Sequence, residues 1–178
     1  MRAFPFVLAA AATGATLSLV TASAAGAASA PTPVTFAVAV GTLSISAPIG
    51  SVSLGTNGVP GGTLSLPLGT VTVTDARAGT TGWLATVDTV AWVGPSQTIP
   101  KTAMTYLPGT ATLLLGQVAV VTPGSLTPVA FGGSALTAQT ANAVVGNNTA
   151  GWNPTLSVAI PGTALAGTYS GTVTHSVL

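Results

Sequence analysis

Residues 169–177 read Tyr-Ser-Gly-Thr-Val-Thr-His-Ser-Val, and this stretch decides the fold class. Tyr, Gly, Val, His and Val occupy every second position, and a serine or threonine occupies each position between them. Successive side chains of a β-strand point to opposite faces, so the pattern predicts a strand with one apolar face and one hydroxyl face. The apolar face would carry Tyr169, Gly171, Val173, His175 and Val177.

The same alternation recurs earlier in the chain, at residues 43–46, 69–74 and 155–160. The chain also contains thirty threonines, whose branched side chains suit a pleated surface. Its 22 Gly and 13 Pro gather in turn sequences such as Asn57-Gly58 and Pro60-Gly61-Gly62. Short strands separated by turns predict an all-β, antiparallel β-sandwich of the Ig-like or Greek-key type. Residues 134–145 are Ala-rich but contain Thr and Val, so they are interpreted as strand or loop.

The N-terminus has the three-part layout of a secretory signal peptide. Met1-Arg2 is followed by an apolar stretch over residues 4–20 and then by small residues up to Ala30. Cleavage is expected after Ala24 or Ala27, so residues 1–27 would be the signal peptide and residues 28–178 a single secreted domain. The apolar stretch is at the short end for a membrane span and lacks a basic far flank. No transmembrane segment is expected in the mature protein.

Charge is the scarcest property of the chain. Only 3% of the residues are charged and 48% are hydrophobic, and there is no cysteine. A nucleic-acid partner is therefore excluded, because its binding needs clustered Lys and Arg. Disulfides are excluded too, and the mature chain offers only His175, Asp75 and Asp88 as metal ligands, too few for a typical zinc site. We expect no cofactor.

Titratable side chains are too few to favour catalysis, so the chain is interpreted as a non-enzyme. A triad could combine His175 with Asp75 or Asp88, but no serine lies in a G-x-S-x-G sequence. Asp75 and Asp88 could also form a glycosidase pair. Residues two apart on a strand share a face, however, so Asp75 and Arg77 are expected to form a structural ion pair. His175 is expected to pack on the apolar face of its strand.

Three tryptophans stand out in a mature chain that is poor in aromatic residues. An indole ring can stack on the C–H face of a sugar, and it can also fill a core of small residues. Trp83 and Trp152 are expected in the core. In one straight strand from Trp83 to Val93, Trp83 and Trp92 would face opposite sides, so Trp92 could lie in the core or outside it. Trp83, Trp92 and His175 are the candidate ligand or interface residues.

Two segments resemble the WxL domain, a β-rich surface domain of Gram-positive bacteria. The first is Leu-Gly-Thr-Val-Thr-Val-Thr-Asp-Ala-Arg at residues 68–77, followed by Gly-Trp-Leu-Ala-Thr-Val at residues 82–87. The family similarly has a strand that ends in D-x-R, a short turn and a Trp-led strand. The second is residues 161–178, which resemble the family's proline-led turn and Tyr-led final strand. Literal W-x-L motifs are absent, and the phrase at residues 152–156 resembles a divergent exported group of actinobacteria.

The resemblance implies a non-catalytic cell-surface role and non-covalent association with the cell wall, through peptidoglycan, other carbohydrate or other surface proteins. It places the first motif site at Trp83 and the second at His175. The expected localisation is therefore extracellular and cell-wall associated. The alternative is a self-assembling structural protein of an extracellular coat or fibre. A neutral surface repels its own copies weakly, and uncharged edge strands can pair between molecules.

Overall fold

The computed structural model describes residues 32–114 and 117–178, and the expected signal peptide lies outside these ranges. Residues Ala37–Leu178 cluster into one compact unit, separate from the unit that ends at Phe36. No helix among the described residues is long and apolar enough to cross a membrane.

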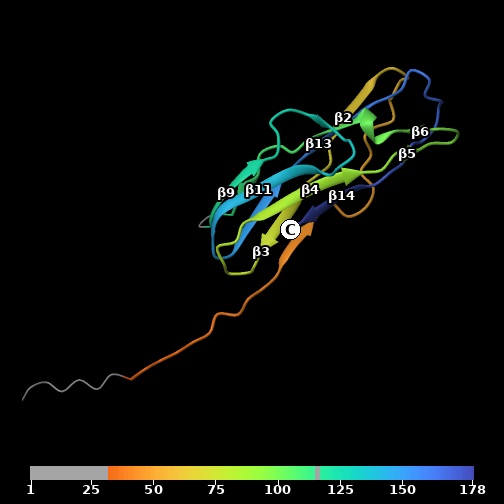
Figure 1. The fold of residues 1–178 in the computed structure, drawn as a ribbon. Helices are drawn as coiled ribbons and strands as arrows, with labels where there is room; N and C mark the ends of the chain where they lie inside the picture. Colours follow the sequence, from red (N-terminus) through yellow and green to blue (C-terminus); the bar gives the residue numbers. More distant parts are fainter. Residues whose placement is uncertain (1–31, 115–116) are drawn as a thin grey trace, which may run out of the picture. The chain divides into compact units, whose positions relative to one another are not determined.

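Strands account for nearly all of the regular structure (Figure 1). Within the described residues there is one 3₁₀ turn, η1, which spans Lys101–Ala103. The strands are β1 (Leu43–Ser46), β2 (Thr63–Pro67), β3 (Val71–Asp75), β4 (Trp83–Thr89), β5 (Trp92–Val93), β6 (Thr98–Ile99), β7 (Met104–Leu107), β8 (Thr112–Leu113), β9 (Val118–Pro123), β10 (Val129–Ala130), β11 (Leu136–Val145), β12 (Asn148–Trp152), β13 (Thr155–Ala159) and β14 (Val173–Val177).

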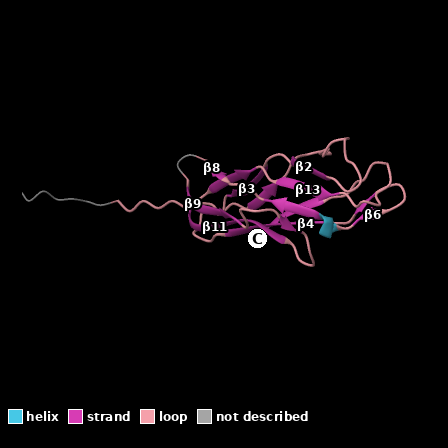
Figure 2. Ribbon diagram, turned by 90° about the horizontal axis from the view of Figure 1, so that it is seen from above, coloured by secondary structure: helices cyan, strands magenta, loops and turns pink. Residues whose placement is uncertain are grey.

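The strands form antiparallel sheets arranged in two layers (Figure 2). One layer is the sheet β14-β4-β11-β9. The other contains the sheets β1-β3-β12-β8 and β10-β7-β13-β2. The two short strands β5 and β6 pair separately as a hairpin. The predicted all-β antiparallel sandwich is confirmed.

The two sheets of the second layer are joined by a register shift. Pro67 lies opposite Thr155, and Val71, four residues later, lies opposite Trp152, three residues earlier. The β2–β3 segment therefore has one extra residue, which is the signature of a β-bulge. Gly69 takes up the irregular backbone with a φ of +94°, and its N–H donates to Asn153 Oδ1 at 3.1 Å.

One hydrophobic core lies between the layers. It contains residues from both layers, among them Val71 and Val73 of β3, Ala85 and Val87 of β4, and Leu156 of β13. The burial of β3 and β4 alternates along each strand, as the sequence pattern predicts. Small side chains from β4, β11 and β12 allow the few aromatic rings to fill the space between the sheets.

Residues 136–145 lie within the stretch interpreted as strand or loop, and they form the long strand β11. Two other details of the strands differ from the sequence pattern. The last strand starts at Val173 rather than Tyr169, although Ser170 makes an isolated bridge to Val93. The condition of one straight strand from Trp83 to Val93 is not met, because β4 ends at Thr89 and β5 begins anew at Trp92.

Candidate functional site

Asp75, Arg77 and Trp83 belong to one polar network at the end of β3. Arg77 donates from Nε to Asp75 Oδ1 at 2.9 Å and from Nη2 to Asp75 Oδ2 at 3.0 Å. Asn148 of β12 donates from Nδ2 to Asp75 Oδ2 at 3.4 Å, and its Oδ1 accepts from Trp83 Nε1 at 3.0 Å. The ion pair is therefore connected through Asn148 to a tryptophan of the opposite layer.

This network is structural because its polar atoms satisfy one another inside the fold. Asp75 is 2% exposed, and the pKa of its carboxyl is held below the ordinary value mainly by the hydrogen bond from Arg77. Arg77 also donates to the backbone oxygens of Thr81 and Gly82, at 3.2 Å and 3.0 Å. Those bonds fasten the turn that leads into β4. Trp83 is buried in the core and presents no ring face for a sugar.

The remaining two charged side chains within residues 32–178 also form an ion pair. Lys101 Nζ lies 3.0 Å from Asp88 Oδ1, and Lys101 lowers the pKa of that carboxyl. This pairing joins η1 to β4, and nothing in the local sequence spacing indicates it. All four charged side chains of residues 32–178 are therefore neutralised in pairs.

His175 contributes to a second polar chain, which runs through Tyr106. Trp152 Nε1 donates to the Tyr106 hydroxyl at 3.3 Å, and that hydroxyl lies 3.0 Å from His175 Nε2. The simplest arrangement has Tyr106 donating to Nε2, which leaves the ring proton on Nδ1. His175 Nδ1 is buried and has no hydrogen-bond partner among the described residues.

Burial keeps the side chains of Tyr106 and His175 uncharged at neutral pH. It lowers the pKa of His175 to about 4 and raises the pKa of Tyr106 to about 12. His175 is half-buried beside Val173 and Val177, on the inward face of β14. The geometry makes it a packed, neutral imidazole rather than an exposed aromatic platform.

Trp92 is half-buried outside the central sheets, in the β5–β6 hairpin. Its Nε1 donates to Thr89 Oγ1 at 3.3 Å, and its ring lies directly over Gly171, where a side chain would clash with it. Trp92 therefore packs the hairpin onto the segment that precedes β14. The structure does not bring Trp83, Trp92 and His175 together into one site.

The candidate Ser-His-Asp triad is not assembled among the described residues. Asp75 and Asp88 each form an ion pair with a basic side chain, and neither hydrogen-bonds to His175, which pairs with Tyr106 instead. Nor does any group of three or more His, Cys, Asp or Glu side chains that could hold a metal ion occur within residues 32–114 and 117–178.

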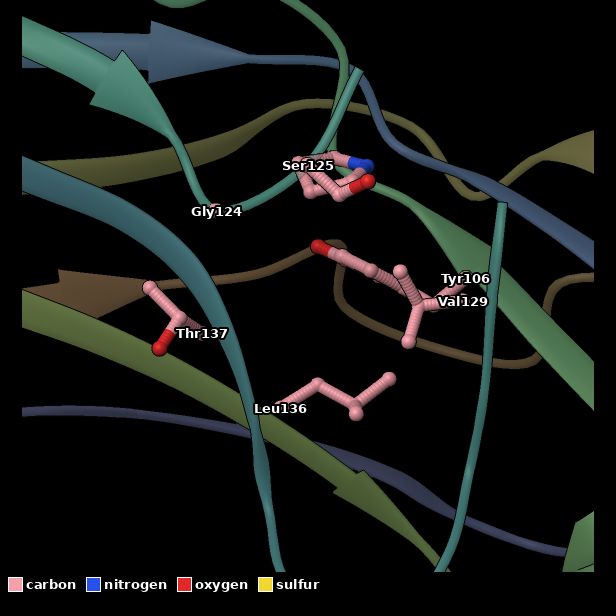
Figure 3. A pocket seen from close by; sticks show the side chains of 7 residues that line it. Tyr106, Gly124, Ser125, Val129, Leu136 and Thr137 are labelled. Carbon is pink, nitrogen blue, oxygen red and sulfur yellow. The ribbon is translucent and has the colours of Figure 1, made fainter. Parts of the chain in front are cut away.

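A small pocket of about 180 Å³ lies beside Tyr106 (Figure 3). Its only titratable side chain is Tyr106, whose raised pKa keeps the hydroxyl protonated. Ser125 also lines this pocket. Its hydroxyl donates a hydrogen bond to the backbone oxygen of Thr127 and accepts one from the Thr127 N–H. The pocket therefore lacks an activated nucleophile and a base. Its lining is Tyr106, Pro108, Gly124, Ser125, Val129, Leu136 and Thr137.

A larger and more open groove of about 470 Å³ lies along β8 and β12, on the outward side of their sheet. Gly151 leaves space between Thr72 and Thr112, its neighbours on the adjacent strands. The groove contains no charged residue. It combines threonine hydroxyls with the exposed apolar side chain of Leu114, whereas Leu113 packs toward the core. Its lining is Thr70, Thr72, Thr110, Thr112, Leu113, Leu114, Thr149, Gly151, Trp152 and Asn153.

Sequence reasoning missed Asn148, Tyr106 and the groove. Asn148 is the second asparagine of the polar sequence Gly-Asn-Asn-Thr at residues 146–149, which suggests only a turn or a glycosylation site. The threonines of the groove come from segments separated by dozens of residues, so only strand pairing brings them together. The alternation of Thr70, Thr72 and Thr74 was the one local signal of an outward hydroxyl face.

Comparison with known protein families, curated proteins and solved structures finds no match to this chain. The resemblance to the WxL domain therefore stays a prediction.

Proposed function

We propose that this protein is a secreted, non-enzymatic cell-surface protein that associates non-covalently with cell-wall carbohydrate through the groove along β8 and β12. The observation that carries the proposal is the makeup of this groove. It is open and uncharged, and it is lined by hydroxyl groups beside apolar side chains.

Glycan chains present the complementary chemistry. Their hydroxyls exchange hydrogen bonds with side-chain hydroxyls and amides, and their C–H faces pack on apolar groups. Thr72 and Thr149 supply hydroxyls, and Leu114, which is 58% exposed, supplies an apolar side chain. Asn153 is exposed at the end of the groove, with its Oδ1 occupied by Gly69 and its amide nitrogen available to a ligand. The open shape suits a polymer that passes through rather than a small molecule enclosed on all sides.

The proposal assigns binding to different residues from those the sequence suggested. Trp83 and His175, the positions of the WxL-like motifs, support the fold from inside, and Trp92 holds a hairpin. The WxL-like arrangement of the segments remains an independent reason to expect attachment to the wall of a Gram-positive bacterium, of the actinobacterial type. The groove and the WxL-like segments both favour the cell wall as the location, but they involve different residues.

The test is co-sedimentation of the mature protein with isolated Gram-positive cell walls and with purified peptidoglycan. Gly151→Val fills the groove, and the added Cβ meets only ordinary contacts, 3.7 Å from Thr70 Cγ2 and from Thr72 Oγ1. Valine also suits a strand. We expect this variant to fold normally and to bind walls at least about tenfold more weakly.

Gly162→Val is the matched control, because it adds the same side chain at a turn where nothing lies within 4 Å. It should bind like the unaltered protein. Equal binding by Gly151→Val and Gly162→Val would show that the groove is not the binding site. If the unaltered protein does not pellet with cell walls above background, the proposed function itself is contradicted.

A further inference from the structure

We infer that residues 32–40 act as a donor strand, which pairs with the free edge of β9 on a second copy of this chain. This self-assembly goes beyond the proposed association with the wall and does not depend on it. Residues 32–40 have the sequence of a strand and no partner strand among the described residues.

Residues 32–40 read Thr-Pro-Val-Thr-Phe-Ala-Val-Ala-Val, and their apolar side chains alternate over the whole second half. Val34, Phe36, Val38 and Val40 would share one face of a strand, and only small residues would lie on the other. All nine residues are exposed, and no hydrogen bond joins them to another described residue. An alternating apolar segment with an unpaired backbone is suited to strand addition.

The edge strand β9 offers the complementary surface. It is last in its sheet and pairs only with β11 among the described strands. Its sequence, Val-Ala-Val-Val-Thr-Pro, has no charged residue and no proline before the last position, so it lacks the usual protection against strand pairing. Val118 and Val120 are each 55% exposed, and Val145 lies directly opposite Val118 on β11. The edge of the sheet at β9 therefore combines free backbone groups with exposed aliphatic side chains.

A second copy is a better partner than the chain's own edge. The segment enters the fold at β1, which lies against β14, whereas β9 is at the other side of the β14-β4-β11-β9 sheet. Crossing three strand spacings covers roughly 14 Å and would use about four of the nine residues. Too few would remain to pair along all of β9. Because donor and acceptor lie at different places on each copy, the contact is head-to-tail and can continue from copy to copy.

The experiment uses three variants of the mature chain that each add one positive charge. Val38→Lys alters the donor segment and Val120→Lys alters the acceptor edge. Leu165→Lys is the control, since Leu165 is 54% exposed, close to the 55% of Val120, and lies outside both surfaces. All three change the net charge equally, so a general increase in repulsion between copies cannot separate them. Circular dichroism verifies that each variant folds.

Sedimentation velocity across a concentration series should show growing oligomers for the unaltered chain and for Leu165→Lys. Val38→Lys and Val120→Lys should each stay monomeric. A mixture of these two should form one-to-one dimers and nothing larger, because one variant keeps a working edge and the other keeps a working donor segment.

Three results would overturn the inference. The unaltered chain could stay monomeric at all concentrations, as it would if the donor segment paired within its own molecule. The Val38→Lys and Val120→Lys variants could assemble as well as Leu165→Lys. Their mixture could also remain monomeric. None of these results bears on wall binding, which is measured separately.

Discussion

Among single residues, the charged ones are nearly all used to hold the fold. Asp75 is buried and accepts bonds from Arg77 and Asn148, whereas Asp88 forms its pair with Lys101 near the surface. A buried carboxylate needs its partners far more than an exposed one, because it has no water to replace them. Removing a partner of Asp75 should therefore destabilise the fold more than removing Lys101, whose pair with Asp88 is screened by water.

His175 is the residue that should make the fold sensitive to acid. Its pKa is about 4 in the folded chain, below the ordinary value of 6.5, so the fold favours the neutral ring. The resulting stability is complete above pH 6.5 and is lost as the pH falls from 6.5 toward 4. The loss should reach at most about 3 kcal/mol. Asp75 has a lowered pKa too, but its effect belongs below its ordinary value of 3.8.

Urea unfolding at several pH values between 7 and 4.5 tests this expectation. His175→Gln keeps an acceptor for the Tyr106 hydroxyl and removes the titration. The variant should show a nearly flat free energy of unfolding over this range, in contrast to the unaltered chain. The same acid-induced loss in both proteins would assign the effect to a group other than His175.

Among the elements, the bulge between β2 and β3 has the greatest influence on the groove. It shifts the register by one residue, and beyond it Val71 lies opposite Trp152. The shift places Thr72 opposite Gly151 and so forms the hollow of the groove. Gly69 makes the bulge possible, because its φ of +94° is rarely adopted by residues with a side chain.

Gly69→Ala should therefore destabilise the chain more than alanine at another glycine with positive φ. Gly61, with a φ of +80°, has nothing within 4 Å of an added Cβ, so Gly61→Ala measures the backbone strain alone. At Gly69 the added Cβ would also lie 2.8 Å from Pro48 Cγ. We expect about 1–2 kcal/mol lost for Gly61→Ala and roughly 1 kcal/mol more for Gly69→Ala.

Thermal or urea unfolding of the two variants side by side measures this difference. Equal losses would mean that Pro48 moves aside freely and that the bulge depends on φ alone.

For the molecule as a whole, neutrality is the governing property. Residues 28–178 contain two positive side chains, Arg77 and Lys101, and two negative ones, Asp75 and Asp88, and all four are paired. The outward faces of the strands carry Thr and Ser in place of charge, as in the alternating exposure of β3 and β14. Such a surface offers little long-range attraction to a charged polymer.

The proposed wall binding should consequently be insensitive to salt. Raising NaCl from about 0.05 M to about 1 M shortens the range of charge–charge attraction severalfold but leaves hydroxyl and apolar contacts in place. The bound fraction in co-sedimentation should stay within about twofold across this series. Release of most of the protein at high salt would indicate an ionic attachment, for which the groove offers no charged group.

The sequence by itself determined the strand character, the fold class and the neutrality, because period-two alternation and charge count are properties of neighbouring residues. It also indicated the Asp75–Arg77 pair, since two residues so close on a strand share a face. Only the tertiary structure decided that Asn148 joins this pair to Trp83 and that β9 is left as a free edge. It also decided that Gly151 opens a groove between Thr72 and Thr112. These features depend on which distant strands pair and in what register, and a one-residue shift at Gly69 changes every such partnership beyond it.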